Sequence, residues 1–223
     1  LGVRRRFQPA RFLLEDDPQA WSDVLDADWL WRVAGSARLL AGATGAEAER
    51  CAKVLGAAER EALKNRVDID LAAQNPPRFG AGDDVALEVD VKNVRALEVK
   101  VFRIDAVAYW LAKSAEVDTS IDLDGMVPSG PERTLTFDTA PIQRHRVRID
   151  LPECKRPGTY IVELIGNGRS SRALLRKGVL RHLTRPSAAG VVVSVMDDEG
   201  QALPDARLWL AGRELAPRAG NIT

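Results

Sequence analysis

Residues 85–101 read Val-Ala-Leu-Glu-Val-Asp-Val-Lys-Asn-Val-Arg-Ala-Leu-Glu-Val-Lys-Val, and their pattern indicates the fold. Apolar side chains occupy every second position in residues 85–91 and again in residues 97–101, and a Lys-Asn break separates the two runs. A period of two is typical of a half-buried β-strand, because successive side chains point to opposite faces of a sheet. Two neighbouring strands are therefore predicted here.

Further strands of the same kind follow along the chain. The strands predicted at 159–165 and 170–177 are separated by Asn167-Gly168, a dipeptide typical of a two-residue hairpin turn. A helical turn is expected between strands at residues 105–113. Many short strands with little helix predict a mainly β fold, an antiparallel Ig-like sandwich over about residues 75–178. The further strands are predicted at residues 134–138, 145–151, 159–165 and 170–177.

Residues 18–67 carry helix signals instead. Asp17 before Pro18 is typical of a helix start, and apolar residues then recur at helical spacing. Trp21 and Trp29 belong to this pattern and are expected to anchor a core.

A second helix is expected to begin at Thr44. Its hydroxyl is predicted to form a capping box with Glu47, three residues later. An apolar stripe continues through Cys51, Leu55 and Ala62.

Proline-rich breaks divide the chain. Pro76-Pro77 cannot continue a helix, and Arg185-Pro186-Ser187-Ala188 marks a second boundary. Beyond it, strand-like residues 191–195 and 208–210 flank a turn-rich acidic stretch at 197–200. We expect the chain to be a fragment of a longer protein. The predicted domains are a helical segment at 1–74, a β-sandwich at 75–185 and the truncated beginning of a second β-domain at 186–223.

Composition narrows the classes of function. The 223 residues contain 32 basic and 32 acidic side chains, so the formal net charge is zero. The chain therefore has no overall positive charge that would attract nucleic acid or an anionic membrane. With 45% apolar and 29% charged residues, the chain is neither disordered nor collagen-like. No apolar run approaches the roughly 18 residues of a membrane-spanning helix, and two cysteines are too few for a disulfide scaffold. Neither nucleic acid binding nor membrane insertion is expected.

Several stretches together resemble a macroglobulin-like domain of the alpha-2-macroglobulin family. Residues 75–85 form a proline- and glycine-rich entry, Asn-Pro-Pro-Arg-Phe-Gly-Ala-Gly-Asp-Asp-Val, followed by the strands at 91–94 and 97–104. Residues 157–163, Pro-Gly-Thr-Tyr-Ile-Val-Glu, are similar to a strand near the end of such a domain. Residues 193–208 are similar to the start of the following module.

This resemblance implies a structural scaffold module of a larger multidomain protein, with neighbouring domains of the same polypeptide as partners. It also implies an extracytoplasmic location, periplasmic or secreted, which nothing else in the sequence indicates. Protease-trapping members use a bait region and often a thioester in a Gly-Cys-Gly-Glu-Gln motif. Cys51 and Cys154 lie in neither, so such chemistry is expected only outside this chain.

One candidate metal site lies in residues 118–125. Asp118, Asp122 and Asp124 alternate before Gly125, and such carboxylates can converge on a hard cation such as calcium. The spacing departs from an EF-hand, because the first carboxylate and the bidentate glutamate are missing. The alternative is a solvated acidic turn beside an edge strand.

One candidate binding surface lies in a predicted strand. Arg144, Arg146 and Arg148 alternate and are expected to place three guanidinium groups on one face. They would dock an acidic partner or a polyanion. The alternative is a solvated face, neutralised by the acidic loop at 118–125 of the same sandwich.

No catalytic or cofactor motif is found. His145 and His182 are the two histidines available as general bases, and no nucleophile-elbow motif surrounds Ser170 or Ser171. The chain is therefore expected to be a non-catalytic structural or interaction module that needs no cofactor. The alternative is a sandwich that binds a protein or carbohydrate ligand as an accessory to an enzyme.

Overall fold

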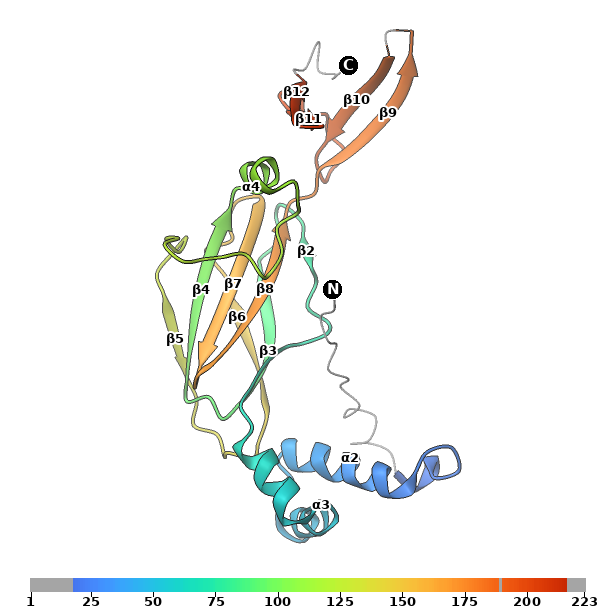
Figure 1. Ribbon diagram of the computed structural model, residues 1–223, viewed down its shortest axis with the longest axis vertical. Helices are drawn as coiled ribbons and strands as arrows, with labels where there is room; N and C mark the ends of the chain where they lie inside the picture. The colour runs from blue at the N-terminus through green and yellow to red at the C-terminus, as the bar shows by residue number, and fades with distance from the viewer. Residues whose placement is uncertain (1–17, 189, 216–223) are drawn as a thin grey trace.

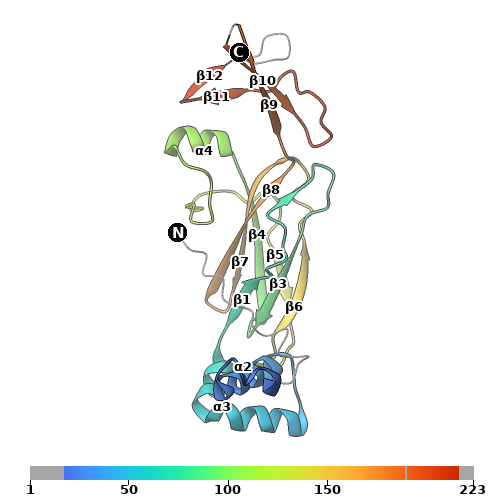
Figure 2. The same cartoon turned by 90° about the vertical axis from the view of Figure 1, so that its right-hand side faces the viewer.

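The computed structural model describes residues 18–188 and 190–215 (Figure 1). Three parts follow one another along the long axis: a helical pair at one end, a β-sandwich in the middle and a group of short strands at the other end (Figures 1 and 2). The predicted mainly β, antiparallel fold with an N-terminal helical segment is confirmed.

The helical pair consists of α2 (Ala27–Leu40) and α3 (Gly45–Asn65). The predicted helix start at residue 18 is wrong, because Pro18–Trp21 makes one 3-10 turn, η1, and the helix begins after Asp26. Asp26 Oδ1 accepts a hydrogen bond of 2.7 Å from Trp29 N, so this carboxylate caps the first turn. The predicted cap at Asp17 lies outside the described residues.

Two further expectations about the helices are corrected. Thr44 is the N-cap residue of α3, but its side chain makes no capping hydrogen bond. Trp21 and Trp29 are 42% and 47% exposed, so they do not anchor a core. The helices instead meet through Leu39, Cys51 and other small or aliphatic residues, because the helical pair is too thin to enclose an indole ring.

The sandwich is made of two sheets. The three-stranded sheet has the order β1-β3-β6, and the five-stranded sheet has the order β2-β8-β7-β4-β5. All pairings are antiparallel except the short parallel contact of β2 with β8. The strands are β1 (Asp68–Leu71), β2 (Arg78–Phe79), β3 (Ala86–Lys92), β4 (Ala96–Ile104), β5 (Arg133–Thr136), β6 (His145–Asp150), β7 (Gly158–Gly166) and β8 (Arg169–Lys177).

The main core lies between the two sheets. Alternate residues of the predicted strands enter it, among them Val89 and Leu97, both fully buried. Tyr160 also lies in it, and its hydroxyl donates a 2.6 Å hydrogen bond to Arg156 O, four residues earlier. This contact resembles the tyrosine corner of Ig-like sandwiches, which ties the start of a strand to the preceding loop.

A second apolar cluster covers the outer face of the five-stranded sheet. Phe102 and Ile161 point outward from β4 and β7 and pack under Val117 and Leu123 of the long α4–β5 connection. Helix α4 (Ala106–Lys113) begins this connection, as predicted, with Asp105 as its N-cap. The middle of this sheet is therefore buried on both faces.

The predicted hairpin turn is confirmed. Asn167 and Gly168 join β7 to β8 with φ values of +44° and +70°. Two consecutive positive φ angles are those of a type I′ turn, whose twist matches that of the flanking strands.

Short strands follow the sandwich. β9 (Arg181–Ser187) pairs with β10 (Gly190–Met196), and β11 (Leu208–Leu210) pairs with β12 (Arg213–Leu215). The predicted domain boundary at 185–188 lies largely in β9. Pro186 is opposite Val191 in the ladder. A proline is tolerated there because the described part of the chain places β9 at a sheet edge.

The positions of the strands can be compared with the predicted domain boundaries, which divide the chain into residues 1–74, 75–185 and 186–223. β1 lies before residue 75, yet it pairs with β3 of the sandwich. The sandwich ladders end at Lys177, and residues 216–223 lie outside the described residues. The division into domains stays a prediction.

Candidate functional site

The three predicted arginines form one side of a charge ladder on the outer face of the three-stranded sheet. Arg144 Nη2 lies 2.7 Å from Asp70 Oδ2, and Arg146 Nε lies 2.8 Å from Asp90 Oδ1. Arg148 Nε lies 3.0 Å from Asp150 Oδ1. The strand register explains the first two pairs, because Asp90 of β3 is opposite both Asp70 of β1 and Arg146 of β6. Arg148 and Asp150 lie two residues apart on β6, on the same face of the strand.

The neutralising carboxylates thus come from β1, β3 and β6 and not from the loop at 118–125. Asp90 is 7% exposed and lies 3.6 Å from Arg144 as well as next to Arg146. Its hydrogen bonds raise the pKa of Arg146 above the ordinary value. An external anion would have to compete with these carboxylates for the arginines, so the anionic-partner hypothesis stays a prediction.

The three predicted calcium ligands serve as turn formers. Asp118 Oδ1 accepts hydrogen bonds from Ser120 N at 2.7 Å and from Ser120 Oγ at 2.6 Å, which hold the pKa of Asp118 below its usual range. Asp122 Oδ1 accepts from Asp124 N at 3.0 Å. Within residues 18–188 and 190–215, no group of three or more histidine, cysteine or acidic side chains is placed to hold a metal ion. Calcium binding by Asp118, Asp122 and Asp124 therefore stays a prediction.

An arginine holds this loop on the sheet. Arg172 of β8 forms an ion pair of 2.7 Å with Glu163 of β7 and donates a 2.9 Å hydrogen bond to Ile121 O. The side chain thereby connects the outer face of the sheet to the chain that crosses it. The sequence offers no signal for this role, because the partner is a backbone carbonyl about 50 residues away.

The joint between the helical pair and the sandwich is built around Lys92. This side chain is fully buried at the end of β3, and its Nζ donates to Lys64 O at 3.0 Å and to Arg66 O at 2.7 Å. It therefore satisfies carbonyl groups at the C-terminus of α3, where a cation is also favoured by the helix dipole. Burial lowers the pKa of Lys92 to about 8, although Asp68, directly opposite in β1, favours the charged form.

Other contacts strengthen the same joint. Asn93 Nδ2 donates to Arg66 O at 2.9 Å, beside Lys92. Arg144 N donates a 2.8 Å backbone hydrogen bond to Leu40 O at the end of α2, and Ile142 packs against the helical cluster. Both helices are thus bonded to the sandwich.

The joint at the other end is built around Asp198. This residue lies in the turn after β10, and its Oδ2 accepts a 2.7 Å hydrogen bond from Ala81 N, while Oδ1 accepts from Val179 N at 2.5 Å. Ala81 belongs to the loop after β2, and Val179 follows β8. One carboxylate therefore connects two loops of the sandwich to the C-terminal strands.

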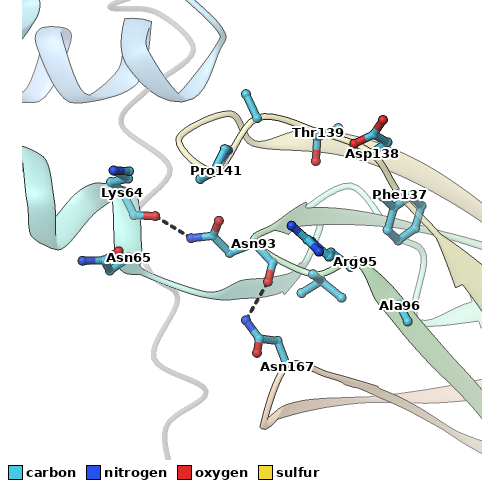
Figure 3. A pocket seen from close by; sticks show the side chains of 12 residues that line it. Lys64, Asn65, Asn93, Arg95, Ala96, Phe137, Asp138, Thr139, Pro141 and Asn167 are labelled. Atoms are coloured by element: carbon cyan, nitrogen blue, oxygen red, sulfur yellow. Dashed lines mark hydrogen bonds between the residues drawn. The ribbon is translucent and has the colours of Figure 1, made fainter.

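A cavity of about 820 Å³ lies beside the joint at α3. It is lined by the end of α3, the β3–β4 turn, the segment after β5 and the β7–β8 turn. Figure 3 shows Asn93 between Lys64 of α3 and Asn167 of the β7–β8 turn, with dashed lines marking the hydrogen bonds that connect them. The cavity wall is therefore assembled from three separate parts of the sandwich and one helix.

Comparison with known proteins agrees with this fold. Residues 97–178 match the family model described as AbpF first immunoglobulin-like domain. The chain is 34% identical over 154 residues to Actin-binding protein F of Dictyostelium discoideum, an alignment that covers 67% of this chain and 6% of that protein. The chain thus spans a small fraction of the length of this curated relative.

Two solved structures of Escherichia coli alpha-2-macroglobulin are also similar. The one spanning domains MG0-NIE-MG1 has a TM-score of 0.41 at 15% identity and covers 62% of this chain and 48% of that chain. The one spanning domains NIE-MG1 has a TM-score of 0.42 at 14% identity, with coverage of 70% and 86%. The chain contains an immunoglobulin-like β-sandwich domain, as its resemblance to macroglobulin-like domains predicted.

Proposed function

We propose that this chain is a non-catalytic connecting and interaction module of a larger alpha-2-macroglobulin-like multidomain protein. The observation that carries the proposal is that hydrogen-bonded joints occur at both ends of the sandwich, around Lys92 and Asp198. The small share of the Dictyostelium relative that the chain matches agrees with a module of a long protein. The actin binding in that relative's name belongs to the whole protein, and the proposal does not rest on it.

The joints would hold neighbouring domains at fixed angles. A linker without side-chain contacts lets two domains reorient freely, whereas bonds to loops on either side of a connection restrict rotation. At the C-terminal joint, Asp198 accepts from both Ala81 and Val179, so the connection after β8 is held at two points. At the helical joint, Lys92 and the Arg144–Leu40 bond fix the ends of both helices.

A non-catalytic role is supported by the environment of the histidines. His145 lies edge-on to Phe137, with ring centroids 5.0 Å apart, and in the described part of the chain neither ring nitrogen has a hydrogen-bond partner. Burial lowers the pKa of His145. His182 is exposed in β9 opposite Val195. Among residues 18–188 and 190–215, neither histidine has a hydrogen bond to a hydroxyl or thiol nucleophile, which a general base would need.

An extracytoplasmic location is part of the proposal and is supported by the family resemblance. Among the described residues, no helix is long and apolar enough to cross a membrane. Fractionation of the source cells, with detection of the parent protein outside the cytoplasm, is the expected result. Recovery with cytoplasmic markers would contradict this part of the proposal.

The joints are tested by measuring distances between spin labels on cysteines introduced at Glu98 of β4 and Arg185 of β9, both exposed. Cys51 and Cys154 are buried, and burial raises the pKa of both thiols, so they react slowly with the label. A single narrow distance distribution is expected. Asp198→Ala should broaden it, because both acceptors of the joint are lost.

Glu199→Ala is the matched control, because Glu199 is an exposed acidic neighbour that takes part in the turn through its backbone N–H. Asp198→Asn keeps one carbonyl oxygen and should broaden the distribution less. A distribution that is equally broad with and without Asp198, in variants of unchanged circular dichroism, would overturn the proposal.

A further inference from the structure

The cavity beside the C-terminus of α3 is lined by charged side chains that have no ion-pair partner among the described residues. Lys64 and Arg95 both line it, and neither side chain forms an ion pair within residues 18–188 and 190–215. Asp138 lines the same cavity, and among the described residues it likewise has no cationic partner. Two cations and one carboxylate thus face a shared space, with an excess of positive charge.

The cavity wall also presents side-chain amides in fixed positions. Asn93 is held in a left-handed conformation, φ +55°, by hydrogen bonds from its Nδ2 to Lys64 O and Arg66 O. Asn167 Nδ2 donates to Asn93 O at 2.8 Å (Figure 3). These bonds use the amide nitrogens, and no donor in the described part of the chain bonds to Oδ1 of Asn93 or Oδ1 of Asn167, so both can act as acceptors.

The same chain shows what an asparagine amide does beside extended backbone. Asn75 Nδ2 donates to Glu88 O at 2.7 Å, and Asn75 Oδ1 accepts from Glu88 N at 2.7 Å. One amide thereby pairs with both backbone groups of a residue in β3, in the place of a neighbouring strand. The Oδ1 atom of an amide that lines a cavity can accept from an N–H group of a bound peptide in the same way.

The size of the cavity agrees with such an occupant. The volume of about 820 Å³ lies within the range of about 300–1,000 Å³ typical of binding sites. Phe137 and Pro141 add apolar surface to the polar wall (Figure 3). The wall is about as polar as it is apolar, which suits a ligand that presents backbone amides and an acidic side chain.

We infer that this cavity binds an extended peptide segment of a partner protein that carries an acidic side chain. The ligand carboxylate lies between Lys64 and Arg95, and backbone N–H groups of the segment donate to Oδ1 of Asn93 and Asn167. This binding site goes beyond the proposed connecting role and does not depend on it.

The test uses the blocked peptide Gly-Ser-Glu-Glu-Ser-Gly as the probe and its glutamine counterpart as the control peptide. Nitrogen-15 correlation spectra of the whole chain report the side-chain amides of Asn65, Asn93 and Asn167 together with the backbone at 93–96 and 137–140. We expect saturating shifts confined to these groups, with a Kd of about 1 mM or tighter. The glutamine peptide should bind at least about tenfold more weakly.

Matched variants distinguish a site from general attraction. Lys64→Gln with Arg95→Gln should remove the shifts, and Arg50→Gln with Lys53→Gln should leave them, because this second pair is exposed on α3 outside the cavity. The proposal is overturned if the acidic peptide causes no shifts at about 5 mM. It is also overturned if the first variant keeps the shifts, or if a heparin fragment or an oligonucleotide binds there in preference to the peptide. The connecting role would survive each of these outcomes, because its test measures distances across the other joint.

Discussion

Lys92 Nζ lies 2.7 Å from Arg66 O, so a fully buried ammonium group closes the C-terminus of a helix from inside a β-sandwich. The side chain belongs to the row of polar residues on the outer face of β3, with Glu88 and Asp90. That face would be open to solvent at this point if the end of α3 did not cover it. The joint therefore places a titratable cation where water is excluded.

Lys92 should make stability depend on pH. Its pKa falls from 10.5 in the unfolded chain to about 8 in the folded protein. Between these values the unfolded chain binds more protons, so the unfolding free energy rises with pH, by about 2 kcal/mol between pH 8 and 9.5. Urea unfolding of wild type and Lys92→Met at several pH values in this range isolates the effect, because other groups titrate equally in both proteins. Parallel pH profiles would contradict the assigned role of Lys92.

Tyr160→Phe should destabilise the sandwich by about 1–2 kcal/mol. The change removes the hydroxyl that donates to Arg156 O at 2.6 Å and leaves a carbonyl without that partner. Tyr109→Phe is the control, because Tyr109 packs at the edge of the outer cluster and should change stability by less than about 0.5 kcal/mol. Chemical denaturation measures both, and equal effects would show that the Tyr160 hydroxyl contributes little.

Asp90→Asn should cost about 2–4 kcal/mol, because it leaves Arg144 and Arg146 without their shared, largely buried carboxylate. Asp150→Asn removes the partner of Arg148, but that pair is mostly exposed and should cost less than about 1 kcal/mol. Chemical denaturation of wild type and both variants in low and high salt measures the two changes in unfolding free energy. A cost for Asp90→Asn as small and as strongly screened by salt as that of Asp150→Asn would contradict the ladder.

Calcium should leave the melting temperature unchanged. Asp118 and Asp122 already accept hydrogen bonds from their own turns, and the described residues contain no converging ligand set. Differential scanning calorimetry in calcium and in chelator makes the comparison. A rise in melting temperature with calcium that disappears in Asp118→Asn would support the calcium hypothesis.

The strands with clear alternation could be predicted from the sequence, and others could not. Residues 85–101 contain enough apolar positions at a period of two to indicate β3 and β4. The Asn167-Gly168 dipeptide indicates the hairpin of β7 and β8. β1 has four residues and β2 has two, too few to show a period. β9 is exposed along its whole length and includes a proline, so it lacks an apolar face to detect.

The candidate sites were harder to predict for a related reason. The alternation of Arg144 and Arg146 places both on one face. Their partners follow from the registers of β6 with β3 and of β3 with β1, which a single strand does not contain. The alternation along β3 predicts a polar, outward-facing side chain at Lys92. Its burial results from the C-terminal end of α3, which covers it. Asp198 lies in an ordinary acidic turn, and its role depends on loops about 20 and more than 100 residues away.

The route of the chain through the sandwich has a mechanical consequence. The chain enters through β1 beside the helices and leaves through β8 at the opposite end (Figure 2). Tension applied to the two flanking segments would pull along the axes of β1 and β8, against their antiparallel neighbours β3 and β7. Ladder hydrogen bonds lie perpendicular to the strands, so this load would shear many of them at once and would not peel them apart singly. A module connected in this way resists stretching in the direction in which it joins its neighbours.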